Sequence, residues 1–310
     1  MLQNKIAIIV LVGPTAVGKT EVGIELAKLL NTEIITADSM QIYRYLDIGT
    51  AKPTPEQQKL VKHYMIDVVN PDEPYNAAIY SQQAETSAMN LYQQNKVPVV
   101  VGGTGLYIRA LLDGIFEQPK IDAEWRNKFK QENENKNSLE LYAELQQVDT
   151  SAAAKIHPND RRRIIRALEV FYYFHVPISQ LQKEQREQGT RFQPYHFGLK
   201  MEMNSLYIRI DSRVERMLNQ GWIEEVKELQ NRGYSPWLLS MQGLGYRHIS
   251  AYLDRAIDYD QMVYLIKRDT RHYAKRQMTW FRANPRIIWF DLQTESREKI
   301  VSEIVLQIKK

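Results

Sequence analysis

Runs of consecutive apolar residues alternate along the first third of the chain with stretches in which apolar residues recur at helical spacing. Unbroken apolar runs such as 6–12 and 97–101 are typical of strands buried on both faces of a parallel sheet. Strands are predicted at residues 6–12, 33–36, 65–68 and 97–101, and helices at 21–30 and 77–94. This alternation predicts an α/β fold with a parallel sheet and helices on both faces.

The pattern changes after about residue 120. Residues 131–137 are polar, and the clearest helical stretches that follow are 138–148 and 161–174. Further on, strands are predicted at 195–201, 206–210 and 286–290, and helices at 213–232 and 295–308. We therefore predict a core formed by residues 1–119 and 196–310, with a helical insertion domain at 120–195.

Composition narrows the class of protein. Of the 310 residues, 44% are hydrophobic and 25% charged, which is ordinary for a globular chain. No apolar run approaches 18 residues and no signal region precedes the first strand, so we expect a cytoplasmic protein without a membrane span. The absence of cysteine excludes disulfides, thiolate catalysis and cysteine zinc sites. Nothing in the sequence demands a partner chain, so a monomer is expected.

The strongest motif follows the first predicted strand. Residues Gly13-Pro14-Thr15-Ala16-Val17-Gly18-Lys19-Thr20 fit the phosphate-loop pattern G-x-x-x-x-G-K-[ST] at every fixed position. Its amides and the following helix N-terminus converge on an anion, with Lys19 at the oxygens of a diphosphate and Thr20 on Mg²⁺. The hydroxyl of Thr15 either adds a contact or shapes the turn. The motif alone leaves open whether the ligand is a nucleotide or another diphosphate.

Two further segments end predicted strands. Asp38 is a candidate base, although an Asp at this place also serves as a helix cap or stands behind a metal. Gly102-Gly103-Thr104-Gly105 allows close backbone approach and presents the hydroxyl of Thr104, or makes a tight turn into a helix. No clear second acidic strand end is visible, because the best candidate strand runs into Gly102-Gly103-Thr104 instead, and this weakens the interpretation as an ATPase.

Basic residues gather in three places. Arg209 and Arg213 flank Asp211, so that one can reach a diphosphate while the other pairs with Asp211, unless both make surface ion pairs. The run 161–166 is either a solvated face or a phosphate-binding patch. Residues 267–286 hold seven basic residues against one acid, in a chain whose net charge is only +4. Within them, 275–282 mixes cations, an amide and aromatic rings, which is typical of nucleic-acid surfaces.

Taken together, these segments resemble the tRNA dimethylallyltransferases, also called tRNA isopentenyltransferases, over nearly the whole chain and in order. The matching segments are 13–20, Asp38-Ser39-Met40-Gln41-Ile42-Tyr43, Ile48-Gly49-Thr50-Ala51-Lys52-Pro53, 102–107, His157-Pro158-Asn159-Asp160, 166–170, 209–215, Gln242-Gly243-Leu244-Gly245-Tyr246 and 275–282. Two departures exist. Residues 173–177 replace a Thr-Gly turn found in many relatives, and the zinc finger of eukaryotic relatives is absent, as in the shorter bacterial form.

The resemblance implies a P-loop NTPase-like α/β core and a reaction. A dimethylallyl group moves from dimethylallyl diphosphate to N6 of adenosine 37, beside the anticodon of a tRNA, and diphosphate leaves. By this resemblance residues 13–20 bind the donor's diphosphate, Asp38 takes the proton from N6, Arg213 contacts the diphosphate, and Lys19 and Thr20 complete the catalytic set with Mg²⁺.

The resemblance also implies residues that contact the tRNA anticodon stem-loop. They are Asp38, Ser39, Met40, Gln41, Thr104, Arg126, Asn159, Asp160, Arg161, Arg162, Arg163, Gln242, Gly245, Tyr246, Arg247, Lys275, Arg276, Gln277, Thr279, Trp280 and Arg282. Two other functions are weighed against this one. A phosphate-loop small-molecule kinase would use ATP and an acceptor pocket at Asp38, and a non-catalytic RNA-binding module would bind tRNA without turnover.

Overall fold

A computed structural model describes residues 5–114, 121–187 and 190–309. The chain divides into two compact units, residues 1–112 with 191–310, and residues 113–190. The predicted boundaries were 119/120 and 195/196, and the first of these lies outside the described residues. Each unit is described by itself below.

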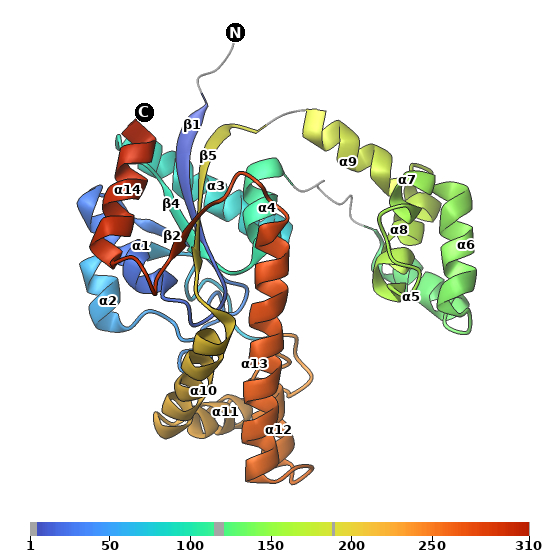
Figure 1. Cartoon of the computed structure of the whole chain (residues 1–310). Helices are drawn as coiled ribbons and strands as arrows, with labels where there is room; N and C mark the ends of the chain where they lie inside the picture. Colours follow the sequence, from blue (N-terminus) through green and yellow to red (C-terminus); the bar gives the residue numbers. More distant parts are fainter. Residues whose placement is uncertain (1–4, 115–120, 188–189, 310) are drawn as a thin grey trace. The chain divides into compact units, whose positions relative to one another are not determined.

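The first unit is built on one parallel sheet (Figure 1). Its strands are β1 (Ile6–Val12), β2 (Ile34–Ala37), β3 (His63–Tyr64), β4 (Val99–Gly102), β5 (Phe192–Lys200) and β6 (Ile288–Asp291). They lie in the order β3-β2-β4-β1-β5-β6, and every pair is parallel. All residues of β4 and all but Ala7 of β1 are buried, which explains the unbroken apolar runs at these two strands. The predicted α/β fold is confirmed.

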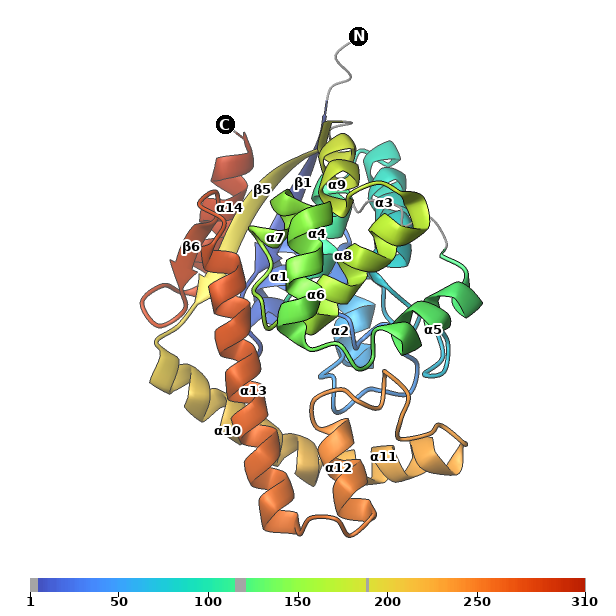
Figure 2. The same ribbon diagram turned by 90° about the vertical axis from the view of Figure 1, so that its right-hand side faces the viewer.

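Helices cover both faces of this sheet. α1 (Lys19–Leu29) and α14 (Arg297–Lys309) lie on one face, and α3 (Ala77–Gln93) and α4 (Gly105–Asp113) on the other (Figures 1 and 2). The face under α1 and α14 is a continuous apolar core that includes Leu11, Leu26 and Ile300. The remaining helices of the unit are α2 (Pro55–Leu60), α10 (Met203–Asn219), α11 (Trp222–Asn231), α12 (Tyr246–Leu253) and α13 (Tyr259–Arg282).

Three predicted elements are wrong. Residues 206–210 are not a strand but part of α10, whose buried positions Leu206, Ile210, Val214 and Met217 recur at helical spacing. Residues 65–68 do not form the third strand either, because Met65 and Asp67 have positive φ angles of 64° and 54°, and β3 precedes them. The single helix expected at 213–232 is two helices, separated at Gly221, where φ is 98°.

The second unit is helical throughout its described part. It contains α5 (Ala123–Glu132), α6 (Ser138–Val148), α7 (Thr150–Ala153), α8 (Arg161–Phe174) and α9 (Ile178–Glu187). Its own core includes Phe129, Leu141, Leu145, Ile164 and Leu168, so this unit buries an apolar centre without help from the sheet. In neither unit is any described helix both long and apolar enough to span a bilayer.

Candidate functional site

Three loops meet at the carboxyl edge of the sheet. Val12 at the end of β1 and Ala37 at the end of β2 are both in register with Gly102 at the end of β4. The phosphate loop, Asp38 and residues 103–105 therefore leave the sheet side by side. This is the edge at which ligands of open α/β sheets bind.

The phosphate loop leaves the first turn of α1 available to an anion. Gly18 precedes the helix with a φ of 113°, which favours glycine, and no side chain caps the helix N-terminus. The amides of a first turn have no partner within the helix. Together with the helix dipole, they form a binding place for phosphate oxygens.

Lys19 curls back over this loop. Its Nζ donates to the carbonyl oxygens of Gly13 at 3.0 Å and Pro14 at 2.8 Å. Burial lowers the pKa of Lys19 to about 8; the Asp38 carboxylate opposes this shift and the Arg213 charge adds to it. The ammonium group is therefore poised to become fully charged when an anion arrives.

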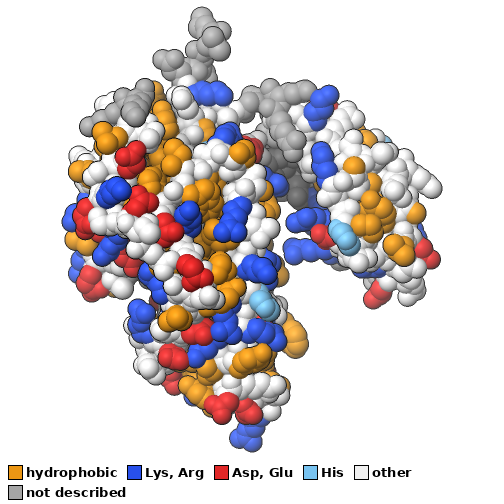
Figure 3. All heavy atoms as spheres, viewed as in Figure 1, with side chains coloured by type: hydrophobic (Ala, Val, Ile, Leu, Met, Phe, Trp, Pro, Cys, Tyr) orange, Lys and Arg blue, Asp and Glu red, His pale blue; other side chains and the backbone are white. Residues whose placement is uncertain are grey.

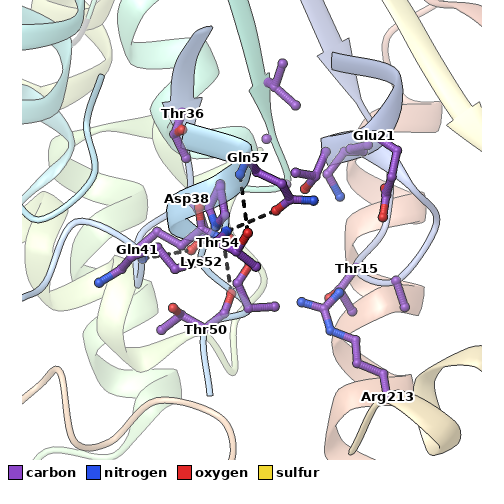
Figure 4. Close-up of a pocket in the computed structure, with 18 of the residues that line it drawn as sticks. Thr15, Glu21, Thr36, Asp38, Gln41, Thr50, Lys52, Thr54, Gln57 and Arg213 are labelled. Atoms are coloured by element: carbon purple, nitrogen blue, oxygen red, sulfur yellow. Dashed lines mark hydrogen bonds between the residues drawn. The ribbon is translucent and has the colours of Figure 1, made fainter. Parts of the chain in front are cut away.

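Two arginines of α10 face the same loop. Burial lowers the pKa of Arg213, against the opposing charges of Asp38 and Glu21. Figure 4 shows Arg213 and Thr15 on one side of a cavity and Asp38 and Gln41 on the other. One turn earlier, the Arg209 guanidinium lies near the α-carbon of Gly18. The predicted contact of Asp211 with one of these arginines is wrong, because Asp211 pairs with Arg271 of α13 at 2.9 Å.

The cavity between these groups measures about 810 Å³. Its lining includes the phosphate-loop residues Thr15, Ala16, Gly18, Lys19 and Thr20, with Glu21, Asp38, Gln41, Arg209, Arg213 and residues 50–55. Both the cations and the candidate base thus open onto one space, which is large enough for a small diphosphate and part of a nucleobase.

Asp38 is held by its own loop. Its Oδ1 accepts the backbone N–H of Met40 at 2.8 Å and of Gln41 at 3.3 Å, and no residue of the described ranges bonds Oδ2. One oxygen thus fixes the carboxylate, and the other remains available to a ligand. The sequence left a capping alternative for Asp38; the structure shows that it caps its loop with one oxygen and lines the cavity as well.

Thr104 links the ends of β2 and β4. Its Oγ1 accepts the backbone N–H of Ser39 at 3.0 Å, and its own N–H donates to the carbonyl of Ala37 at 3.0 Å. Its carbonyl also accepts the Tyr107 amide in the first turn of α4. Thr104 therefore makes the tight turn and at the same time fixes the segment that carries Asp38.

Gln277 of α13 ties the phosphate loop to the end of β4. Its Oε1 accepts the backbone N–H of Thr15 at 2.8 Å, and its Nε2 donates to the carbonyl of Gly103 at 2.9 Å. A β-carbon at Gly103 would lie 2.2 Å from this Nε2, so glycine is needed there. Gln277 is buried and both ends of its amide are engaged inside the protein, so its observed contacts position the phosphate loop.

Tyr273 lies one turn before Gln277 and also lines the cavity. Burial and the charge of Asp38 raise the pKa of Tyr273 to about 12, while the nearby side chains of Thr104 and Gln277 oppose this shift. The sequence analysis missed this residue. The only available signal was its four-residue spacing from Gln277, which places both on one helix face.

The rest of α13 carries exposed cations (Figure 3). His272, Lys275, Arg276, Thr279 and Trp280 line a shallow depression of about 450 Å³. Lys267, Arg268 and Arg271 pair with Glu215, Asp269 and Asp211. In contrast, Lys275, Arg276 and Arg282 make no ion pair within the described ranges. The positive charge left for a ligand is therefore concentrated at the C-terminal half of the helix.

Hydrogen bonds inside the protein hold the start of α12 and the segment at residues 47–49 through one carboxylate. Tyr246 is buried and donates to Glu225 at 2.7 Å. The same carboxylate accepts the backbone N–H groups of Asp47, Ile48 and Gly49 at 2.9, 2.6 and 3.2 Å. Of the other predicted tRNA contacts here, Gln242 is exposed, Gly245 precedes α12, and Arg247 pairs with Asp269 at 2.7 Å.

The second unit holds the remaining predicted tRNA contacts. Asp160 caps α8 by accepting the Arg163 amide at 3.1 Å, and Asn159 precedes it. Arg161 donates to the backbone carbonyls of Asn133, Glu134 and Lys136, so it closes the end of α5, whereas Arg162 and Arg163 are exposed. Arg126 pairs with the buried Glu169 at 3.7 Å. The arginine run thus combines one internal contact with two exposed cations.

The cavity offers a few oxygen donors to a magnesium ion that arrives with a phosphorylated ligand. Thr20, Glu21 and Asp38 bring oxygen donors to it, and no cluster of three or more His, Asp or Glu able to hold a metal exists in the described part of the chain. Mg²⁺ is commonly bound by one or two protein oxygens with substrate phosphates and waters. The donor set suits an ion that arrives with a diphosphate.

Comparison with known proteins gives a consistent result. The family model "IPP transferase" matches residues 41–284. A tRNA dimethylallyltransferase of Carboxydothermus hydrogenoformans is 45% identical over 97% of this chain and 96% of its own length. A tRNA dimethylallyltransferase 2 of Syntrophus aciditrophicus is 48% identical over 93% of each chain.

Solved structures agree. The full-length tRNA isopentenylpyrophosphate transferase of Bacillus halodurans is 37% identical, with a TM-score of 0.74 over 98% of this chain and 96% of that one. A eukaryotic dimethylallyltransferase acting on tRNA is 27% identical, with a TM-score of 0.77 over 92% of this chain and 74% of that one. The likeness therefore extends over both units of the chain.

Proposed function

This chain belongs to the IPP transferase family of tRNA dimethylallyltransferases, and we propose that its phosphate loop binds dimethylallyl diphosphate. We propose further that Asp38 accepts the proton from N6 of adenosine 37 in a tRNA. The observation that carries the proposal is the shared cavity. Lys19, Arg213 and Asp38 come from three separate elements and open onto one space.

The cationic side of the cavity binds the leaving group. The diphosphate is neutralised before the reaction by the free amides at the start of α1, by Lys19 and by Arg213. The negative charge that the diphosphate gains as it leaves is therefore stabilised by groups that are already in place. Thr20 would hold Mg²⁺, which when bound supplies further neutralisation of the diphosphate oxygens.

The acidic side activates the acceptor. The lone pair of an adenine amino group is delocalised into the ring, so N6 is a poor nucleophile. C1 of the dimethylallyl group is the carbon bonded to the diphosphate oxygen. As the bond between N6 and C1 forms, the C1–O bond breaks and its electron pair leaves with the diphosphate. The N6 proton passes to the Asp38 carboxylate, which avoids a cationic product. The Met40 and Gln41 amides hold that carboxylate in place during the transfer.

Exposed basic residues of α13 bind the RNA. Lys275, Arg276 and Arg282 suit the phosphates of an anticodon stem-loop, and Trp280 offers a flat ring to an unstacked base. The target adenine must leave its stack, which costs a few kcal/mol and less in a loop than in a duplex. We expect the chain to act as a monomer in the cytoplasm.

A comparison of donors tests the proposal. The protein is incubated with a synthetic anticodon stem-loop and either labelled dimethylallyl diphosphate or γ-labelled ATP. Label from dimethylallyl diphosphate should appear on the RNA as N6-dimethylallyladenosine. Label transferred from ATP alone would favour a kinase and reject the proposal, and tight RNA binding without any transfer would leave only a binding module.

A further inference from the structure

We propose that the ring of Tyr273 packs against the dimethylallyl group and stabilises the positive charge that develops on it as the diphosphate leaves. This inference rests on the proposed function, because it assigns a substrate contact within the same cavity. It adds a neutral aromatic group to a site whose charged members are cations and carboxylates.

The lining of the cavity singles out this residue. Among the described residues that line it, Tyr273 is the only Phe, Tyr or Trp, and His63 is the only other aromatic ring. The ring projects from α13, on the helix face that also carries Gln277 to the phosphate loop. A flat apolar surface therefore lies within the space that holds both reacting groups.

The hydroxyl of Tyr273 lies near residues that hold the two ends of the reaction. The side chains of Thr104 and Gln277 are close enough to influence the pKa of this hydroxyl. Thr104 holds the segment that carries Asp38, and Gln277 holds the phosphate loop at Thr15. The bond that breaks and the bond that forms lie between these two places, and Tyr273 lines the same cavity, so we place its ring beside the carbon at which both bonds change. With a pKa of about 12 the phenol stays protonated and neutral.

Charge explains why a ring is useful here. Lys19 and Arg213 attract the diphosphate, but the same two cations repel an allyl group that is becoming positive. Full carboxylates near the carbon would in turn repel the diphosphate. The face of an aromatic ring attracts a cation without carrying net charge, and this interaction reaches about 2 kcal/mol when water is excluded.

Three variants separate the ring from its hydroxyl. Tyr273→Phe keeps the ring, Tyr273→Leu removes it, and Tyr264→Leu is the matched control, because Tyr264 is exposed on the same helix. Each variant is tested in single turnover with saturating stem-loop RNA. The donors are dimethylallyl diphosphate and the same donor with one fluorine on a methyl group, which opposes the build-up of positive charge.

We expect Tyr273→Phe and Tyr264→Leu to stay within about threefold of the parent, and Tyr273→Leu to be about 30-fold slower with the ordinary donor, the equivalent of about 2 kcal/mol. With the fluorinated donor the decrease in rate caused by Tyr273→Leu should be smaller, because less positive charge develops on the allyl group. The ratio of rates on the two donors does not depend on how much of a variant is folded.

The inference is overturned if Tyr273→Phe is as slow as Tyr273→Leu, if the loss in Tyr273→Leu is equal for both donors, or if Tyr273→Leu matches the parent. These results require an active parent enzyme. A parent that transfers no dimethylallyl group would overturn the proposed function, and this inference with it.

Discussion

The depressed pKa of Lys19 predicts how donor binding depends on pH. In the free protein the Lys19 ammonium loses its proton near pH 8, because burial disfavours its charge. A bound diphosphate favours the charged form and raises that pKa. Binding above pH 8 therefore requires the uptake of one proton, and the apparent affinity must fall as the pH rises.

The magnitude follows from the fraction of Lys19 that is charged. With a pKa of about 8, about 90% of the side chain is protonated at pH 7 and about 10% at pH 9. The dissociation constant should therefore rise about tenfold between these values, which is about 1.4 kcal/mol. Below pH 7 the curve becomes flat for this group.

Calorimetry with an unreactive thiolo analogue of dimethylallyl diphosphate, in Mg²⁺ and without RNA, measures both quantities. The second ionisation of a phosphate lies near pH 6, so the ligand keeps its charge across the range. Buffers of different ionisation enthalpy should report uptake of about one proton at pH 9. A Lys19→Arg variant, which stays charged throughout, should show no such dependence. An affinity that is constant from pH 7 to 9.5 in the parent would refute the reasoning.

Three further changes have defined outcomes. Gln277→Leu leaves the buried Gly103 carbonyl and the partly buried Thr15 amide unpaired and should lower the free energy of unfolding by about 2–5 kcal/mol in urea titrations; an unchanged midpoint would show that the link is dispensable. Arg276→Ala should weaken stem-loop binding of any sequence and reduce the salt slope by about 1. Lys299→Ala, on α14, should leave that slope unaltered, and an equal effect of both would count against the assigned RNA face. Glu225→Gln should lower the free energy of unfolding by about 1–3 kcal/mol, because four hydrogen-bond donors lose a charged acceptor. An unchanged free energy of unfolding would be inconsistent with these contacts.

Much of the site at the carboxyl edge of the sheet was predictable, because the sequence patterns that indicate it are local. The phosphate loop is a contiguous pattern between a strand and a helix, and Asp38 follows its strand directly. In contrast, a five-residue stretch such as 206–210 is too short to distinguish a strand from one turn of helix by its apolar positions. The buried positions of the complete helix α10 resolve it.

Contacts between distant segments were not predictable from one sequence. Gln277 reaches Thr15 across 262 positions, and Asp211 finds Arg271 across 60 rather than pairing with an adjacent arginine. Likewise, nothing in a run of three arginines reveals that Arg161 alone turns inward to backbone carbonyls. Such pairings depend on which helix faces meet in the folded chain, and charge counting along the sequence does not contain that information.

The Asp38→Asn variant tests the central claim most directly. The amide oxygen can still accept the Met40 and Gln41 N–H groups, so the loop keeps its shape, but the side chain can no longer take a proton. Single-turnover transfer to an anticodon stem-loop should fall by about 10²–10⁴-fold, with binding of RNA and donor analogue close to that of the parent. A variant that transfers the dimethylallyl group at the parent's rate would contradict the account.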